Sequence, residues 1–213
     1  AKGMELILAD ELGQIGATEV KPAAGGVYFD GDMEMALRVC LWSRLANRVL
    51  LPFAKYSAQT PEQLYAGALK VDWSKHFDVS QTFAIDASIR RSKINHSRYA
   101  EQVIKDAIVD QFKESTNERP NVQRDQPDIR IYAYINEDKV ILSLDLSGDS
   151  LHRRHYRAES VEAPLKENLA AAILIRAGWP KIAAEGGALY DPWCGSGTLL
   201  TEAALMAGQL APG

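Results

Sequence analysis

The sequence has few cysteines and no long apolar run. Its two cysteines, Cys40 and Cys194, lie far apart and outside any Cys-x-x-Cys pair. This argues against a disulfide scaffold or a zinc site and for a reducing cytosol. No apolar stretch approaches the ~18 residues that a membrane span needs, and the first residues lack a basic-then-apolar signal pattern. We therefore expect a cytoplasmic protein with no membrane partner and no metal.

The two commonest phosphate-binding fingerprints are also missing. No Gly-Lys-Ser/Thr of a Walker loop is present, and the glycine-rich stretch near the end has Gly-Ser-Gly-Thr-Leu-Leu where a dinucleotide site has Gly-x-Gly-x-x-Gly. The net charge is −4, from 24 basic and 28 acidic residues. This argues against a protein that binds nucleic acid non-specifically over its whole surface.

Basic residues nevertheless gather in two short stretches. "SIRRSKINHSR" (88–98) contains no acid, and neither does "HRRHYR" (152–157). Such patches are compatible with phosphate contacts on an acidic chain, because only the local field matters within a Debye length of ~8–10 Å. A solvated charged face is the alternative for each stretch. With 213 residues, 46% of them hydrophobic, the chain is of ordinary soluble composition and suits one large domain or two small ones.

Hydrophobic periodicity predicts a mixed α/β fold. Helices are expected over 4–15, from 33 capped by Asp32, from Thr60 and from about Ser97, with strands over 25–32, 48–56, 83–89, 129–135 and 139–148. Pro52 removes a ladder donor, so the strand over 48–56 is predicted at a sheet edge. The polar stretch 113–128 is expected to be a loop.

After Gly148 the sequence becomes polar and basic, which marks a candidate domain boundary. A helix is expected to begin at Pro164 and to be ended by Gly178 and Pro180. A short strand over 186–192 and a helix over 197–208 are expected to follow. A strand, a glycine loop and a helix in succession form the first unit of a nucleotide-type α/β sheet. Trp42, Trp73 and Trp179 are expected in the core.

The glycine loop has features of a cofactor site. Gly195 and Gly197 allow positive φ and close approach to a ligand, and the helix after them directs free N–H groups toward that ligand. Asp191, at the expected strand end, suits a cationic or zwitterionic cofactor better than a pyrophosphate. A tight structural turn is the alternative interpretation.

Here the sequence resembles a known family. "DPWCGSGTLLTEAAL" is similar to the S-adenosylmethionine motif of the THUMP-containing RNA methyltransferases. "LWSRLANRVLLPFAKY", "RPNVQRDQPDIRI", "VILSLDLSGDSLHRRHYR" and "APLKENLAAAILIRAGW" also resemble blocks of that family, in the same order. From end to end the chain resembles the front portion of the bacterial 23S rRNA guanine-N2 methyltransferases, which often carry a second domain for guanine N7.

The resemblance implies a fold of class α/β (α+β) in three parts. These are an N-terminal ferredoxin-like region over 1–34, a THUMP RNA-binding domain over 35–148, and over 149–213 a linker with the first strand, loop and helix of a Rossmann-like methyltransferase. It implies that the full-length enzyme uses S-adenosylmethionine and acts on 23S ribosomal RNA. The implied cofactor contacts are Asp191, Pro192, Cys194, Gly195, Ser196, Gly197 and Thr198.

Seven basic residues are the candidate RNA contacts once this family is admitted: Arg90, Arg91, Lys93, Arg98, Arg153, Arg154 and Arg157. Two positions depart from the family pattern. Trp193 occupies a variable position that usually carries Met or a Phe-like residue, so it could crowd the cofactor or pack behind it. His155 stands where the family usually has Gly in its His-x-Arg-Gly-Tyr-Arg block, which places the local backbone in question.

Two further readings stay open: a non-catalytic RNA-binding module and an adenine-N6 DNA methylase. The THUMP-like half argues against the DNA enzyme, and the loop is not the pyrophosphatase type that a thiouridine-forming enzyme needs. The family's catalytic Asn/Asp-Pro-Pro-aromatic motif has no counterpart in the 213 residues, and no catalytic residue is assigned. We therefore expect a truncated chain that does not catalyse alone.

Overall fold

The computed structural model describes residues 3–156 and 164–213. Its contacts divide the chain into two compact units. Unit 1 combines Ala1–Val49 with Asp149–Gly213, and unit 2 is Leu50–Gly148. The predicted boundary between residues 34 and 35 falls inside unit 1, just after the start of helix α2 (Met33–Trp42), because α2 packs against helix α1 (Glu5–Ile15). Unit 2 is thus an insertion in the sequence of unit 1.

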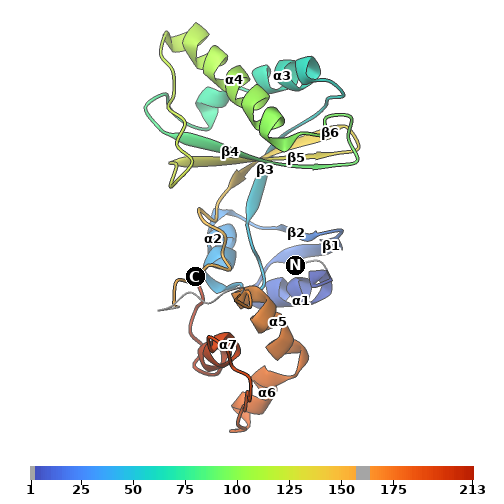
Figure 1. The fold of residues 1–213 in the computed structure, drawn as a ribbon, viewed down its shortest axis with the longest axis vertical. Helices are drawn as coiled ribbons and strands as arrows, with labels where there is room; N and C mark the ends of the chain where they lie inside the picture. Colours follow the sequence, from blue (N-terminus) through green and yellow to red (C-terminus); the bar gives the residue numbers. More distant parts are fainter. Residues whose placement is uncertain (1–2, 157–163) are drawn as a thin grey trace. The chain divides into compact units, whose positions relative to one another are not determined.

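Unit 2 is a four-stranded sheet with helices on one face (Figure 1). The strands follow the order β3 (Leu50–Ser57), β6 (Lys139–Asp145), β5 (Ile129–Asn136) and β4 (Phe83–Arg90). Only the β4–β5 pair is parallel. Helices α3 (Pro61–Leu69) and α4 (Ser97–Thr116) and the 3₁₀ turn Trp73–Lys75 complete the unit. β3 lies at an edge, as Pro52 predicts.

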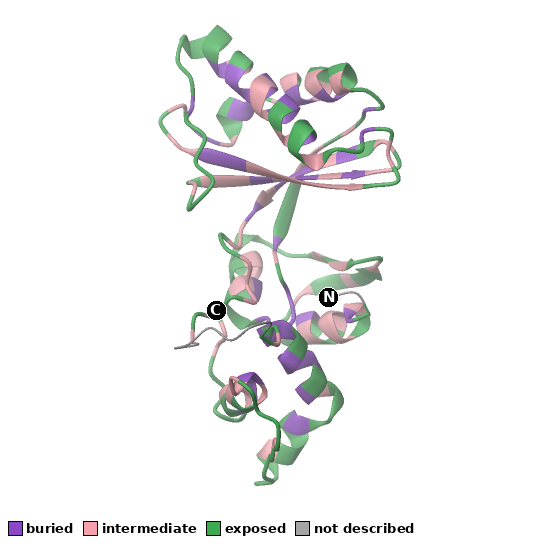
Figure 2. Ribbon diagram, in the orientation of Figure 1, coloured by how far each residue is buried: buried purple, intermediate pink, exposed green. Residues whose placement is uncertain are grey.

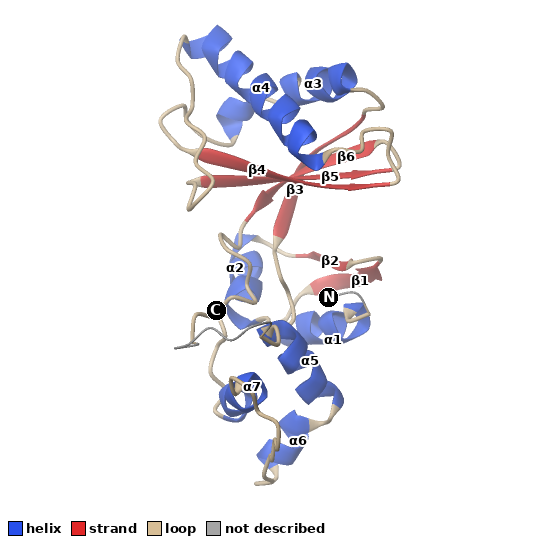
Figure 3. Cartoon of the chain, viewed as in Figure 1, coloured by secondary structure: helices blue, strands red, loops and turns tan. Residues whose placement is uncertain are grey.

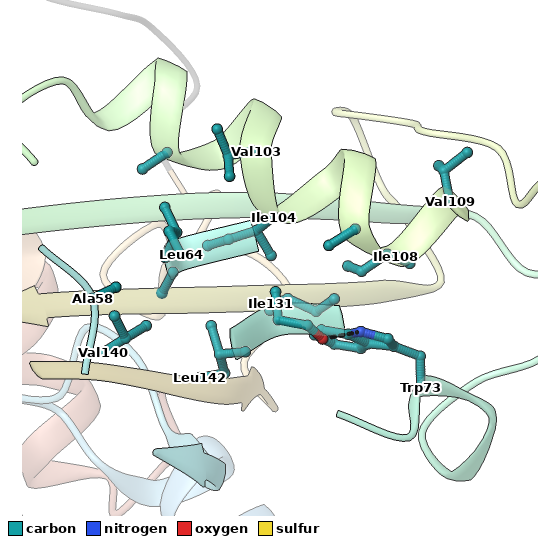
Figure 4. Close-up of a cluster of buried hydrophobic side chains, with 14 of the residues drawn as sticks. Ala58, Leu64, Trp73, Val103, Ile104, Ile108, Val109, Ile131, Val140 and Leu142 are labelled. Atoms are coloured by element: carbon teal, nitrogen blue, oxygen red, sulfur yellow. Dashed lines mark hydrogen bonds between the residues drawn. The ribbon is translucent and has the colours of Figure 1, made fainter. Parts of the chain in front are cut away.

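The core of unit 2 lies between the sheet and these helices (Figure 4). Ile104 and Ile108 of α4 are fully buried, at the helical spacing that the sequence predicts, and face Ile131 of β5 and Leu142 of β6. Trp73 is also fully buried, and its indole Nε1 donates to the Ala68 carbonyl at 2.9 Å. The buried indole therefore has the partner that its polar atom requires.

Helix ends follow local capping chemistry. The side chains of Asp32 and Thr60 accept from Met35 and Gln63 backbone N–H groups, which confirms both predicted caps. The loop prediction for 113–128 is wrong at its start, because α4 continues to Thr116. The Thr116 hydroxyl donates back to the Phe112 carbonyl at 2.7 Å, and Asn117 then ends the helix at φ +58°.

Unit 1 combines elements from both ends of the chain. The first part supplies α1, the hairpin β1 (Thr18–Ala23) and β2 (Gly26–Asp30), and α2; the second part supplies α5 (Glu167–Arg176), α6 (Trp179–Ala184) and α7 (Thr198–Ala207). Met4 and Leu45 are buried in one cluster with Ala171 and Ala172. The first and last parts of the chain therefore share a hydrophobic core, whose buried residues Figure 2 colours.

Three expectations for unit 1 need correction. Residues 187–191 do not form the predicted strand, because they have no ladder partner in the described residues. Pro180 does not end α5; it lies in the first turn of α6, where its missing N–H costs nothing. Trp42 is 42% exposed at the end of α2, whereas Trp73 and Trp179 are buried as expected.

Candidate functional site

The basic stretch 88–98 joins the end of β4 to the start of α4, and a neighbouring turn fixes its backbone. The Asp138 carboxylate accepts from the Ser92 hydroxyl and from the Lys93 N–H, both at 2.9 Å. These hydrogen bonds, the Lys93 N–H first, lower the pKa of Asp138. Ile94 anchors the loop in the core, while Arg91 takes φ +47°. The loop is therefore a defined support for its charged side chains.

All four predicted basic residues of this stretch are exposed: Arg90, Arg91, Lys93 and Arg98. Arg91 lies 3.8 Å from the Glu137 carboxylate, and the Lys93 ammonium donates to Gln59 Oε1 at 2.9 Å. Exposed contacts of this kind contribute little free energy and are easily exchanged for a phosphate. Tyr99, one residue beyond Arg98, is 49% exposed and offers an aromatic face. Unit 2 thus presents the cationic stretch to solvent.

A basic groove of about 680 Å³ runs between β3 and α3, and the sequence analysis missed it. Its lining includes Lys55, Lys70 and Lys75, the last paired with Asp72 at 3.3 Å, and burial lowers the pKa of His76 beside them. The lysines come from three separate segments, so no run of basic letters marks them. Gln63 lines the groove, and its side-chain oxygen accepts from the backbone N–H of Gln59. The side-chain oxygen of Gln59 accepts in turn from the Lys93 ammonium. The groove and the basic stretch are therefore linked by direct hydrogen bonds.

The second basic stretch divides between surface and interior. Arg153 is exposed, but the Arg154 side chain is only 2% exposed and pairs with the fully buried Glu202 of α7. Arg154 is thus unavailable to a phosphate in this structure, which departs from the role expected for it. Arg157 lies outside the described residues. Two adjacent arginines with the same predicted role therefore lie in opposite environments.

His155, the departure from the family's glycine, adopts φ +53°. This left-handed region costs most L-residues about 1–2 kcal/mol and glycine almost nothing. The backbone at this position therefore retains the conformation that a glycine would favour, although the side chain is different.

We expect His155→Gly to raise the free energy of unfolding by up to about 1 kcal/mol, because relief of the left-handed strain outweighs glycine's extra entropy in the unfolded chain. His155→Val should lower it by about 1–2 kcal/mol, since β-branched residues tolerate positive φ least. Denaturant titration of the three proteins measures both changes. Equal stability of the valine and glycine variants would contradict the expectation.

The candidate cofactor loop, 191–197, leads directly into α7, as predicted (Figure 3). Gly195 and Gly197 take φ +52° and +73°, and an added Cβ at either position would meet no atom within 4 Å. The glycines are therefore needed for their backbone angles and leave open space above the loop. Asp191 Oδ1 accepts the Trp193 N–H at 3.1 Å, and the Cys194 carbonyl accepts the Gly197 N–H at 2.7 Å.

The start of α7 has no side-chain cap. Gly197 is its N-cap and supplies no side-chain acceptor, so the first N–H groups are directed at the loop without a cap. The Ser196 and Thr198 hydroxyls lie 3.1 Å apart beside them. Cys194 is exposed, and no set of His, Cys, Asp and Glu suited to a metal occurs among residues 3–156 and 164–213. This arrangement suits a ligand with acceptor atoms.

Two aromatic side chains beside the loop are almost fully exposed. Tyr190 is 87% and Trp193 is 89% exposed. Trp193 is therefore free of close packing in the described chain, and its two expected roles beside a cofactor stay predictions. In the described part of the chain, no helix is long and apolar enough to cross a membrane.

Three family models match the chain in succession. They are the RlmL ferredoxin-like domain over residues 1–50, the THUMP domain over 58–145 and the RMKL-like methyltransferase domain over 154–213. Ribosomal RNA large subunit methyltransferase K/L of Syntrophotalea carbinolica is 58% identical over 212 residues, and that of Methylococcus capsulatus is 55% identical. Both alignments cover 100% of this chain and 30% and 29% of the relative, respectively.

Solved structures match the same three parts. A Listeria monocytogenes protein, described as a predicted N6-adenine-specific DNA methylase, has a TM-score of 0.84 at 31% identity. SMU.472, solved in complex with SAH, has a TM-score of 0.79 at 28% identity. Each match covers 100% of this chain and 55% of the other.

The chain therefore combines a segment that matches a THUMP domain with one that matches part of an RMKL-like methyltransferase domain, and the second segment contains the glycine loop before α7. The two relatives named above, both ribosomal RNA large subunit methyltransferases K/L, are similar to it along its whole length. The chain spans about 30% of the length of those curated relatives.

Proposed function

We propose that this chain is the RNA-docking and cofactor-loop part of an S-adenosylmethionine-dependent methyltransferase that acts on 23S ribosomal RNA in the cytoplasm. The target we propose is N2 of guanine. One observation carries the proposal: a THUMP unit with exposed basic residues is inserted in the same chain as a glycine loop that caps α7 without a side-chain acceptor. The catalytic groups would belong to the longer protein, as its relatives' greater length suggests.

The loop residues fit the cofactor by their chemistry. The Asp191 carboxylate uses one oxygen on the Trp193 N–H and suits the cofactor's ammonium or a hydroxyl with the other. Gly195 and Gly197 leave space for close approach, and the positive end of the α7 dipole suits its carboxylate. Pro192, Cys194, Ser196 and Thr198 complete the proposed contacts. When bound, S-adenosylmethionine supplies an electrophilic methyl group.

For RNA we propose a phosphate-binding surface on unit 2 made of Arg90, Arg91, Lys93 and Arg98. Arg153 of unit 1 is proposed as a further contact, and Arg157 stays a candidate outside the described residues. Phosphate contacts position a protein without reading sequence, so these residues would hold structured RNA with modest specificity. The basic groove between β3 and α3 continues this surface through Gln59 and Gln63.

The double substitution Arg90→Ala, Arg91→Ala should weaken RNA binding and make it less salt-dependent. Each lost phosphate contact removes about 0.7–0.9 from the slope of log K against log salt, so the pair should remove up to about 1.8. Filter binding of ribosomal RNA fragments across a salt series measures this slope.

The matched control is Lys113→Ala, Arg119→Ala, which removes two exposed charges around the other end of α4. Its slope should stay close to that of the unchanged protein. Equal slopes for both double variants would show that only the total charge matters and that 90–98 is a solvated face.

A direct assay tests the proposed activity. The full-length protein should transfer label from S-adenosylmethionine to 23S ribosomal RNA, and mass spectrometry of nucleosides should identify N2-methylguanosine. An adenine-N6 DNA methylase is the alternative that the description of the Listeria structure favours. Methylation of double-stranded DNA at adenine, with no labelled RNA, would support that alternative. No transfer to either would leave an RNA-binding module.

A further inference from the structure

Helix α7, which follows the cofactor loop, is held at its far end by an arginine from the first part of the chain. Arg44 lies two residues beyond α2, and its Nη2 donates to the carbonyls of Leu205 at 3.3 Å and Leu210 at 2.6 Å. These carbonyls belong to the end of α7 and the turn after it, where helical hydrogen bonding runs out. A guanidinium at this end also opposes the negative pole of the helix.

A second arginine holds the middle of the same helix. Arg154 pairs through Nη1 with Glu202, whose side chain is fully buried, and donates through Nη2 to the Arg44 carbonyl at 2.6 Å. The Tyr156 hydroxyl donates to the other Glu202 oxygen at 2.9 Å. Both oxygens of this carboxylate therefore have donors from the connecting segment, and Arg154 ties that segment to residue 44 at the same time.

The segment around Arg44 is itself fixed by a buried carboxylate. Glu11 of α1 accepts from the Ser43 hydroxyl at 2.5 Å and from the Arg44 N–H at 2.8 Å. Burial raises the pKa of Glu11 and lowers that of Arg44. Two glutamates thus balance two arginines in this cluster. A buried charge that loses its partner is strongly unfavourable, so the four groups constrain one another.

The apolar contacts link the same elements. Met206 of α7 packs on the cluster of Met4, Leu45, Ala171 and Ala172, and the Trp179 indole donates to the Ala203 carbonyl at 2.9 Å. α7 therefore lies on a surface to which α1 and residues 43–46 contribute. Its first residue, Thr198, follows the left-handed Gly197 without a break.

We propose that Arg44 and Arg154 are positioning residues that set the orientation of α7 and, through it, of the cofactor loop, so that the N-terminal module forms part of the cofactor site's support. The proposal rests on the proposed cofactor role of the loop. Glu202 lies less than two helical turns from Gly197, since a turn takes about 3.6 residues. A rotation or slide of the helix at Glu202 is therefore carried to Gly197 and to the loop that ends there.

The test compares two neighbouring arginines in the full-length protein, with the dissociation constants of SAH and S-adenosylmethionine measured by calorimetry. Arg154→Met should raise both constants about tenfold or more, because small misplacements of binding groups carry large penalties. Arg154→Lys keeps the charge but cannot donate from two fixed nitrogens at once. Its dissociation constants should therefore lie between those of the unchanged protein and those of Arg154→Met. Arg153→Met should leave both constants within about twofold while reducing the salt slope of RNA binding by about 0.7–0.9.

Coupling separates positioning from general destabilisation. Glu202→Gln alone should weaken cofactor binding, and the double variant Arg154→Met, Glu202→Gln should lose less binding free energy than the two single variants together, because both changes break the Arg154–Glu202 pair. If Arg154→Met fails to fold, Arg44→Lys provides an independent test, because lysine is similar in size to arginine but lacks the guanidinium that contacts the end of α7. The salt slope of RNA binding, which reports on the proposed phosphate contacts, should be unchanged in all of these.

Each outcome has a distinct meaning. Unchanged cofactor affinity in folded Arg154→Met and Arg44→Lys proteins would overturn the positioning role, as would effects of Arg154 and Glu202 that simply add. A reduced RNA salt slope for Arg154→Met at unchanged cofactor affinity would return Arg154 to the RNA contacts. If the unchanged full-length protein binds neither SAH nor S-adenosylmethionine, the proposed function itself fails.

Discussion

In the full-length protein, Gly195→Val and Asp191→Ala should each reduce RNA methylation by about 100-fold or more, a loss of about 2.7 kcal/mol in transition-state stabilisation. Valine at position 195 would have to adopt φ +52°, the region that β-branched residues avoid, so the loop would change shape. Alanine at 191 removes both the acceptor for the Trp193 N–H and the carboxylate proposed for the cofactor. Label transfer from S-adenosylmethionine and calorimetric cofactor binding measure the two effects.

A matched backbone control distinguishes the loop from general strain. Gly25 also has a positive φ of +87° and open space around an added Cβ, but it lies in the turn between β1 and β2. Gly25→Val should therefore lower stability while cofactor affinity is retained. RNA affinity should be nearly unchanged in all three variants. A loss of RNA binding with Gly195→Val would mean that the loop has a wider structural role.

Trp73→Ala should destabilise unit 2 by about 3–5 kcal/mol, the range for removing a large buried aromatic side chain. The indole is fully buried, and its ring centroid lies 5.7 Å from that of Phe53 and 6.5 Å from that of Phe77. RNA binding should fall with the folded population of unit 2. Trp73 belongs to a core cluster separate from that of unit 1, so cofactor affinity should persist.

The milder substitution Trp73→Phe provides the control. It retains an aromatic ring but leaves the Ala68 carbonyl without its 2.9 Å partner. The Ala68 carbonyl still accepts from the Val71 N–H at 3.2 Å, so a loss of about 1–3 kcal/mol is expected from the missing indole hydrogen bond and the smaller ring. Denaturant unfolding compares the two variants, with far-UV circular dichroism as the signal because the substitutions remove a tryptophan that would contribute to fluorescence. Equal losses for alanine and phenylalanine would show that the hydrogen bond, not the packing, dominates.

The sequence predicts best where one local rule decides. The spacing of Ile104 and Ile108 identifies the buried face of α4, and the capping side chains of Asp32 and Thr60 place two helix starts. Pro52 predicts an edge strand for the same reason, since a missing donor is tolerated only there. The glycine loop before α7 and the positive φ values of Gly195 and Gly197 also follow from residue type alone.

Prediction is weaker where a distant partner decides. Residues 187–191 have a strand-like sequence, but a strand exists only when another one pairs with it. Arg153 and Arg154 are neighbours of the same residue type, so the local sequence does not distinguish them. Arg154 is buried because it pairs with the buried Glu202, which lies far along the chain. The lysines of the β3–α3 groove come together by folding and carry no sequence signature.

The position of unit 2 within the chain has a consequence for how such proteins can be built. Its first and last strands are hydrogen-bonded neighbours, with Leu50 opposite Asp145, so the chain enters and leaves the unit side by side. A folded insertion whose two ends lie close together can be replaced without distorting unit 1, because the two attachment points in unit 1 need to be bridged over only a short distance. Unit 2, which is proposed to bind RNA, could therefore be replaced by another folded domain while the two-part unit that carries the glycine loop stays the same.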